Sequence, residues 1–144
     1  MRKKYTIGFT SGVYDMFHIG HLNVLKRAKE LCDFLIVGVS TDEVVLKNKN
    51  KNPIIPFNQR MQIVESIKYV DKVIPQTNYN LDGKKAIVLE YKVDAIFVGS
   101  DWKGTEKWKE IEKELNEIGC DVVYLPHTDG ISSTDLRKKI GNQQ

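Results

Sequence analysis

Cysteine is scarce in this sequence, which contains two in 144 residues. Cys32 and Cys120 are far apart and form no CxxC pair, so we expect both to be buried free thiols that pack like small hydrophobic residues. Long apolar runs are missing as well, and none approaches the roughly 18 residues that a membrane-spanning helix needs. The basic N-terminus soon reaches the polar residues 10–12, unlike a secretory signal peptide. We therefore expect a cytoplasmic protein that makes no membrane contact.

A strong charge of one sign is also missing. The chain has 22 Lys and Arg against 19 Asp and Glu, a formal net charge of +3. Lysines gather in the segment "KNKNKN" (47–52) and do not form a face with interleaved aromatic residues, so we expect no nucleic-acid partner. We interpret this segment as a loop. It is either solvated or binds an anionic substrate and closes over it.

The composition is that of a globular protein, with 41% hydrophobic and 28% charged residues. No repeat, low-complexity tract or linker interrupts the chain, and its length suits one domain of ordinary size. We therefore expect a single domain over residues 1–144, in which only the final "GNQQ" is loosely attached.

Short, almost continuously apolar runs alternate with helical patterns. Strands are predicted near residues 6–12, 34–40, 71–75, 95–100 and 121–126. Helices are predicted from just after His21, from Ser40 with Glu43 as its capping-box partner, through 61–70, over 86–91, from Thr105 to Gly119, and from Ser133 through Leu136 to Ile140. This alternation predicts a Rossmann-like α/β/α fold of three layers, with a parallel sheet of about five strands.

The segment "FHIGH" (17–21) follows the first predicted strand and begins the first helix. Ligands of such folds bind beyond the carboxyl ends of the strands, where helix N-termini favour anions. His18 and His21 are three residues apart and would share one face of a helical turn, while Gly20 leaves room for close backbone approach. Two imidazoles placed there can donate hydrogen bonds to phosphate oxygens on which charge grows during a reaction.

Other interpretations of this pair stay open from the residues alone. Either histidine could be structural and satisfied by backbone partners. A metal pair is possible, although no acidic or cysteine ligand lies at a zinc-like spacing. A dinucleotide site is less favoured, because the first turn has no GxGxxG.

Four segments together resemble a known family. "GVYDMFHIGH" resembles the HxGH signature of the nucleotidyltransferase superfamily. The segments "RMQIVESIKYVDKVIP" (60–75), "VGSDW" (98–102) and "HTDGISSTDLRKKI" (127–140) resemble its cytidylyltransferase branch, the last being similar to an RTEGISTT motif. Their order and spacing over nearly the whole chain are similar to small bacterial glycerol-3-phosphate cytidylyltransferases.

The resemblance implies an activity. Such enzymes join CTP to a small phosphomonoester and release pyrophosphate with the help of Mg²⁺, and the acceptor phosphate attacks the α-phosphorus directly. It also implies a homodimer and a product used for a surface polymer such as teichoic acid or capsule. The alternatives are another acceptor (a polyol phosphate, phosphoethanolamine, phosphocholine, or an amide or amino-alcohol phosphate), adenylyl transfer from ATP, and a nucleotide-binding module without catalysis.

The resemblance further implies roles for individual residues. His18 and His21 would contact the triphosphate and the developing charge, while Val13 and Tyr14 would line the nucleotide pocket. Lys49 and Lys51 would hold acceptor and triphosphate, with Lys47 as a substitute if the loop is offset. The remaining assignments are Lys84, beside Lys85, for the acceptor phosphate; Arg60 for phosphate oxygens; Asp101 for magnesium or a ribose hydroxyl; Trp102 for the site or the core; and Thr128, Gly130, Ile131, Ser132, Ser133 and Thr134 for a phosphate and base cradle.

One position departs from the motif of the family. Where the motif begins with arginine, this chain has His127, which lacks the permanent charge and the two-pronged guanidinium. We expect His127 to contribute to nucleotide binding in a weaker or pH-dependent way.

Overall fold

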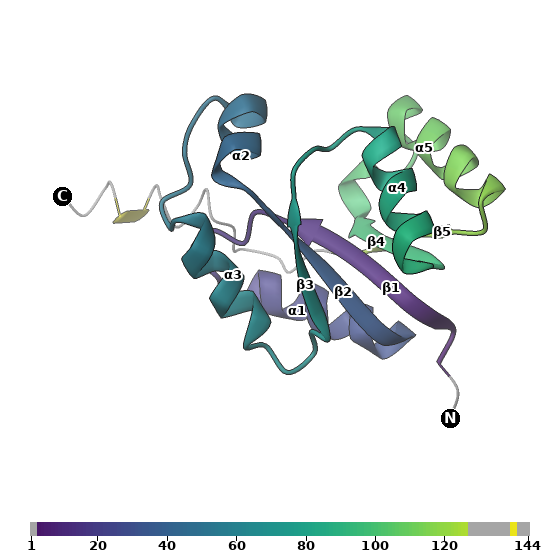
Figure 1. Cartoon of the computed structure of the whole chain (residues 1–144), viewed down its shortest axis with the longest axis horizontal. Helices are drawn as coiled ribbons and strands as arrows, with labels where there is room; N and C mark the ends of the chain where they lie inside the picture. The colour runs from purple at the N-terminus through teal and green to yellow at the C-terminus, as the bar shows by residue number, and fades with distance from the viewer. Residues whose placement is uncertain (1–2, 127–138, 141–144) are drawn as a thin grey trace.

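The fold is built on one parallel sheet. A computed structural model describes residues 3–126 and 139–140. The strands are β1 (Tyr5–Gly12), β2 (Cys32–Ser40), β3 (Lys72–Gln76), β4 (Ala95–Gly99) and β5 (Asp121–Leu125). They form a five-stranded sheet in the order β3-β2-β1-β4-β5, and every pair is parallel (Figure 1). This confirms the predicted fold class, and all five predicted strands are present.

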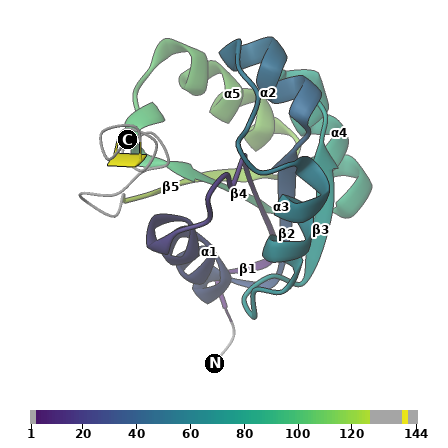
Figure 2. The same ribbon diagram turned by 90° about the vertical axis from the view of Figure 1, so that its left-hand side faces the viewer.

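Helices cover both faces of the sheet. They are α1 (Ile19–Leu31), α2 (Asp42–Lys49), α3 (Phe57–Glu65), α4 (Leu81–Tyr91) and α5 (Glu106–Glu117), with a short 3-10 helix η1 (Ser100–Trp102). Figure 2 shows α1 and α3 on one side of the sheet and α4 and α5 on the other. Because both faces are covered, the strands can be apolar throughout, as their sequences predicted.

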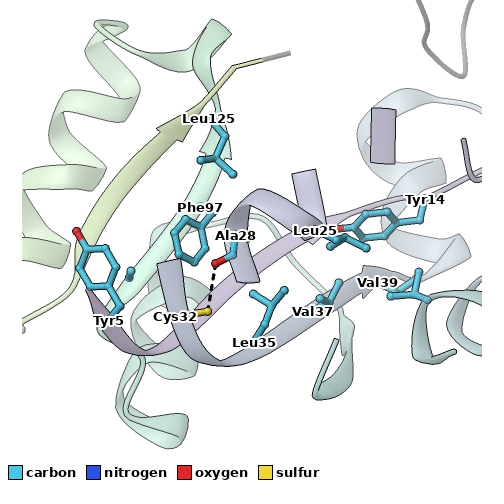
Figure 3. Packing of buried hydrophobic residues seen from close by; sticks show 12 residues of the cluster. Tyr5, Tyr14, Leu25, Ala28, Cys32, Leu35, Val37, Val39, Phe97 and Leu125 are labelled. Carbon is cyan, nitrogen blue, oxygen red and sulfur yellow. Dashed lines mark hydrogen bonds between the residues drawn. The ribbon is translucent and has the colours of Figure 1, made fainter. Parts of the chain in front are cut away.

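Two apolar clusters fill the space between sheet and helices. On the first face, Leu25 and Ala28 of α1 pack on Leu35 and other strand residues (Figure 3). Val64 of α3 belongs to the same cluster. On the second face, Trp108, Ile111 and Leu115 of α5 and Val88 of α4 pack on Ile96 and its neighbours. Cys32 and Cys120 are buried free thiols in these clusters, as predicted.

The second helix does not begin at Ser40, so the predicted capping box is wrong. Ser40 is the last residue of β2 and is fully buried. Thr41 is the N-cap, because its hydroxyl oxygen accepts a 3.2 Å hydrogen bond from the Val44 N–H. The same helix extends through Lys49, so the first half of the "KNKNKN" segment is helical and only its end is a loop. Asn50 ends the helix in the left-handed conformation, at φ 56°.

Other helix boundaries also differ from the prediction. The helix predicted through residue 70 ends at Glu65, and Ile67 and Val70 reach the first core cluster from the turn that follows. The helix predicted from residue 86 begins at Leu81, because Asn80 accepts a hydrogen bond from the Gly83 N–H and caps it. The fifth helix begins after Thr105 as predicted, with Thr105 as its cap, and ends at Glu117, before the predicted stop at Gly119.

The C-terminal helix predicted from Ser133 lies outside the described residues except for 139–140, which are helical. None of the helices in the described part of the chain is long and apolar enough to cross a membrane.

Candidate active site

A cavity of about 810 Å³ lies beyond the carboxyl ends of the strands. Its walls come from the ends of β1, β3 and β4, the loop after β1, the end of α2 and the segment after it, and parts of α1, α4 and α5. The predicted site residues among its lining are Val13, Tyr14, His21, Lys49, Lys51, Lys84 and Trp102. The fold therefore brings together residues that lie far apart in the sequence.

The two histidines of "FHIGH" form a reciprocal cap at the start of α1. His18 is the N-cap residue, and its Nδ1 accepts a 3.0 Å hydrogen bond from the Gly20 N–H. His21, at the third helical position, accepts a 3.2 Å hydrogen bond at Nδ1 from the His18 N–H. The first helix begins before His21, and not after it as predicted, because His18 supplies the cap.

This arrangement fixes the tautomer of both rings. A neutral imidazole accepts at one nitrogen and donates at the other, so rings that accept at Nδ1 carry their proton on Nε2. The rings stack with centroids 3.9 Å apart and an interplanar angle of 28°. The predicted shared face is therefore present. Nε2 of His18 is buried and has no hydrogen-bond partner within the described residues, and His18 is not among the described residues that line the cavity.

Both imidazoles are held neutral. Burial lowers the pKa of His18. Burial, and secondly the positive charge that His18 would carry, lower the pKa of His21 to about 4. Aromatic neighbours contribute to this environment, since Phe17 and Tyr14 have ring centroids 5.2 and 5.4 Å from that of His21. At neutral pH the pair therefore supplies hydrogen-bond donors and not fixed charge.

The lysines that line the cavity come from two sides. Lys49 ends α2 and Lys51 follows it, whereas Lys47 lines a neighbouring cavity of about 570 Å³. Lys49 and Lys51 therefore share the main cavity, and Lys47 does not; their assignment to the phosphates stays a prediction. Lys84, from α4, lines the same cavity.

Lys84 is held in an unusual environment. Its Nζ donates a 2.6 Å hydrogen bond to the Tyr79 carbonyl and lies 5.5 Å from the centroid of the Trp108 ring. Burial, and secondly the charge of Lys107, lower the pKa of Lys84 to about 8. Lys85, beside it, instead forms a 3.0 Å ion pair with Glu114. Lys84 is thus a partly desolvated cation that an anionic ligand would stabilise.

Arg60 does not line the cavity, which disagrees with its assignment to phosphate oxygens. Its side chain is fully buried in α3. The guanidinium donates hydrogen bonds of 2.7 to 2.8 Å to the carbonyls of Ile55, Val13 and Ser40 and to the Asp42 carboxylate. Arg60 therefore holds together the chain segments that form the cavity walls. Its sequence position could not reveal this, because exposure depends on the tertiary packing of α3.

Asp15 also links chain segments that surround the cavity, and this role was not predicted. Its carboxylate is buried and accepts hydrogen bonds of 2.8 and 2.9 Å from the N–H groups of Ile54 and Ile55. It thereby ties the loop that precedes the histidines to the segment that follows the lysines. Its place inside "GVYDMFHIGH" was the available signal. Gln76, a buried cavity residue at the end of β3, was also missed.

The remaining predicted residues fall into two groups. Trp102 lines the cavity and stays half exposed, with its ring centroid 6.4 Å from that of Trp108. Asp101 is exposed on η1 and is not one of the described lining residues. His127, Thr128, Gly130, Ile131, Ser132, Ser133 and Thr134 lie outside the described residues.

The described residues do not form a metal cage for the Mg²⁺ that the resemblance implies. Within them, no three His, Cys, Asp or Glu side chains gather at one point. Among the described residues that line the cavity, Asp15 carries the only carboxylate, and it already accepts two backbone hydrogen bonds. Mg²⁺ often binds through substrate phosphates and water with few protein ligands, so an ion carried by a bound triphosphate would not need such a cage.

The sequence is similar to known proteins over most of its length. A family model described as cytidylyltransferase-like matches residues 9–139. The glycerol-3-phosphate cytidylyltransferase of Bacillus subtilis is 40% identical over 91% of this chain and 94% of its own length. An FAD synthase of Thermococcus kodakarensis is 37% identical over 88% of this chain and 83% of its own.

A solved structure, the lipopolysaccharide core biosynthesis protein of Thermoplasma volcanium, superposes with a TM-score of 0.66 at 30% identity. The match covers 85% of this chain and 96% of that one. Since the family model spans most of the sequence and a relative is similar over nearly its whole length, this chain belongs to the cytidylyltransferase-like family.

Proposed function

We propose that this protein transfers the cytidylyl group of CTP to sn-glycerol 3-phosphate, giving CDP-glycerol and pyrophosphate. An oxygen of the acceptor phosphate forms a bond to the α-phosphorus, and the bond from that phosphorus to the bridging oxygen breaks. The electron pair leaves with pyrophosphate, and no protein nucleophile or proton transfer is needed. The similarity to glycerol-3-phosphate cytidylyltransferases over nearly the whole chain supports this choice of nucleotide and acceptor.

The observation that carries the proposal is the fixed tautomer of the histidine pair. Nδ1 of each ring accepts a backbone N–H, so the proton of each neutral ring is on Nε2. His21 lines the cavity, and His18, whose Nε2 is buried, stacks on it. In the transition state, charge grows on the oxygens around the α-phosphorus, and donors already held in place stabilise it without reorganisation. Because the rings are neutral, they contribute through hydrogen bonds, while Lys49, Lys51 and Lys84 supply positive charge from the cavity walls.

The lysines come from different elements, which suggests how two anions are accommodated. Lys49 and Lys51 come from the end of α2 and the segment after it, and Lys84 comes from α4. We assign the triphosphate chiefly to His21 and Lys51, and the acceptor phosphate to Lys84. Lys49 would contact both anions. Neutralising both anions reduces the repulsion that opposes attack of one phosphate on another.

Adenylyl transfer is a second candidate, because FAD synthases are 37 to 38% identical to this chain. Transfer of a cytidylyl group to another acceptor, such as phosphoethanolamine, is a third, since an Arabidopsis ethanolamine-phosphate cytidylyltransferase is 35% identical over 89% of this chain. A nucleotide-binding module without catalysis is a fourth candidate, which a turnover measurement separates from an enzyme.

The test is pyrophosphate release with Mg²⁺, measured for CTP and ATP in turn with glycerol 3-phosphate, phosphoethanolamine, phosphocholine, other polyol and amide phosphates, and flavin mononucleotide. We expect turnover with CTP and glycerol 3-phosphate. Turnover with ATP alone would show that ATP, and not CTP, is the nucleotide substrate. Turnover with another acceptor alone would show that glycerol 3-phosphate is not the acceptor. CTP binding without turnover on any acceptor would contradict an enzymatic role.

We further propose that Mg²⁺ enters with CTP, that the protein is a cytoplasmic homodimer, and that its product serves the synthesis of a surface polymer such as teichoic acid or capsule. These points rest on the family resemblance. Light scattering coupled to gel filtration tests the dimer. Dependence of turnover on Mg²⁺ concentration tests the metal.

A further inference from the structure

Gln76 is a buried polar residue that lines the cavity. It is the last residue of β3, and its side chain is 3% exposed yet lines the cavity together with Tyr79 and Lys84. The side-chain amide N–H donates a 2.6 Å hydrogen bond to the Asn78 carbonyl. This bond fixes the orientation of the amide, because the nitrogen must face Asn78 and the oxygen Oε1 must point the other way.

That oxygen is an acceptor without a donor. Oε1 of Gln76 is buried and has no hydrogen-bond partner within the described residues. It lies over Gly38 of β2, where a Cβ atom would come within 2.7 Å of it. Gly38 accommodates this position of Oε1 without any shift of the Gln76 side chain. A buried unpaired acceptor costs stability, so a donor from a ligand would satisfy a group that the protein leaves unpaired.

The charges around Gln76 indicate what kind of donor this is. Among the described residues that line the cavity, the cations are Lys49, Lys51, Lys84 and Lys107, and the one carboxylate, Asp15, accepts hydrogen bonds from Ile54 and Ile55. An ammonium group would therefore meet mainly positive charge. A neutral hydroxyl can donate to the amide oxygen without that repulsion.

We propose that Oε1 of Gln76 accepts a hydrogen bond from a hydroxyl of the acceptor alcohol and thereby selects polyol phosphates over alkyl and amino-alcohol phosphates. The inference rests on the proposed function and extends it to a specificity-determining residue. Lys84, which lines the same wall, holds the phosphate of the acceptor, and Gln76 holds its alcohol portion.

The test compares two acceptors on one protein. Glycerol 3-phosphate carries hydroxyls and propyl phosphate carries none, so the ratio of their kcat/KM values reports recognition of the hydroxyl. Gln76→Met keeps the size of the side chain and removes the acceptor oxygen. We expect the ratio to fall about 10-fold, because the site loses one buried hydrogen bond. Gln62→Met, on the exposed face of α3, is the matched control and should leave the ratio unchanged.

A second variant separates recognition from structure. Gln76→Glu keeps an acceptor oxygen but loses the N–H that donates to Asn78. We expect it to retain the preference for glycerol 3-phosphate even if its melting temperature falls. If Gln76→Met does not fold, Gln76→Glu is by itself a sufficient test of the proposal.

An unchanged kcat/KM ratio in Gln76→Met, or loss of the preference for glycerol 3-phosphate in Gln76→Glu, would overturn the inference about Gln76. Turnover by the unmodified protein would still support the proposed function in that case. No turnover by the unmodified protein with CTP and any acceptor would overturn both.

Discussion

Arg60 donates a 2.7 Å hydrogen bond from Nη1 to the carbonyl oxygen of Val13, and so joins α3 to the loop that carries the histidine pair. The same nitrogen reaches the Ser40 carbonyl at the end of β2, and Nη2 reaches Asp42 at the start of α2. One buried guanidinium therefore connects the segments that present the histidines and the lysines to the cavity.

We predict that Arg60→Lys destabilises the protein by about 3 kcal/mol, because an ammonium cannot replace the planar fork and leaves buried carbonyl groups unpaired. Urea unfolding measures this loss. Arg27→Lys is the control, since Arg27 is partly exposed and donates to the Pro126 carbonyl. If Arg60→Lys kept its stability and lost only affinity for CTP, Arg60 would be a phosphate ligand after all.

Asp15→Asn is predicted to loosen the segment between the lysines and α3. The carboxylate accepts two backbone hydrogen bonds, and an amide can accept only with its one oxygen. We expect a loss of about 2 kcal/mol in the free energy of unfolding, together with a higher KM for CTP. Asp33→Asn, at an exposed position, is the matched control. An unchanged KM for CTP would show that this tie does not position the lysines.

Acid should destabilise the protein through His21. Its pKa is lowered to about 4 in the fold, against an ordinary value of 6.5, so the unfolded chain binds a proton more readily. The stability that this group contributes is therefore complete above pH 6.5 and is lost as the pH falls from there toward 4. We predict that the melting temperature of the protein falls more steeply over this range than that of His21→Gln. Parallel curves for the two proteins would contradict the lowered pKa.

Alkaline pH should weaken binding of the acceptor through Lys84. Its pKa is lowered to about 8, so its charge is present below that pH and is lost above it. The acceptor phosphate is already fully ionised there, since the second pKa of such a group is about 6. We predict that kcat/KM for glycerol 3-phosphate declines above pH 8.

Lys107→Gln removes the neighbouring charge and should shift that decline to higher pH, whereas Lys103→Gln, an exposed control, should not. The same midpoint in Lys107→Gln and the unmodified protein would assign the decline to another group.

The sequence predicted the sheet well, because strands buried on both faces carry a continuous apolar signal that does not depend on partners. Helix ends were less predictable. Ser40 and Glu43 have the form of a capping box, but hydrogen bonds from Arg60 to the Ser40 carbonyl and from Tyr79 to its hydroxyl keep Ser40 in the strand. Such competition between a local motif and distant partners cannot be seen in a local pattern.

The site was predicted in the same uneven way. The "FHIGH" motif located the histidine pair, and spacing placed the two rings together. The burial of Arg60 and the unpaired oxygen of Gln76 depend on chain segments that are far apart in the sequence. Neither residue carries a local signal that distinguishes a ligand contact from a structural role.

The most direct test of the account is the kcat for pyrophosphate release from CTP and glycerol 3-phosphate by His18→Asn. Asparagine is a good N-cap residue, so this variant keeps the cap of α1 while it removes the Nε2–H donor. We predict a loss of about 100-fold in kcat, with little change in the melting temperature. Activity close to that of the unmodified protein would contradict the claim that the histidine pair stabilises the transition state.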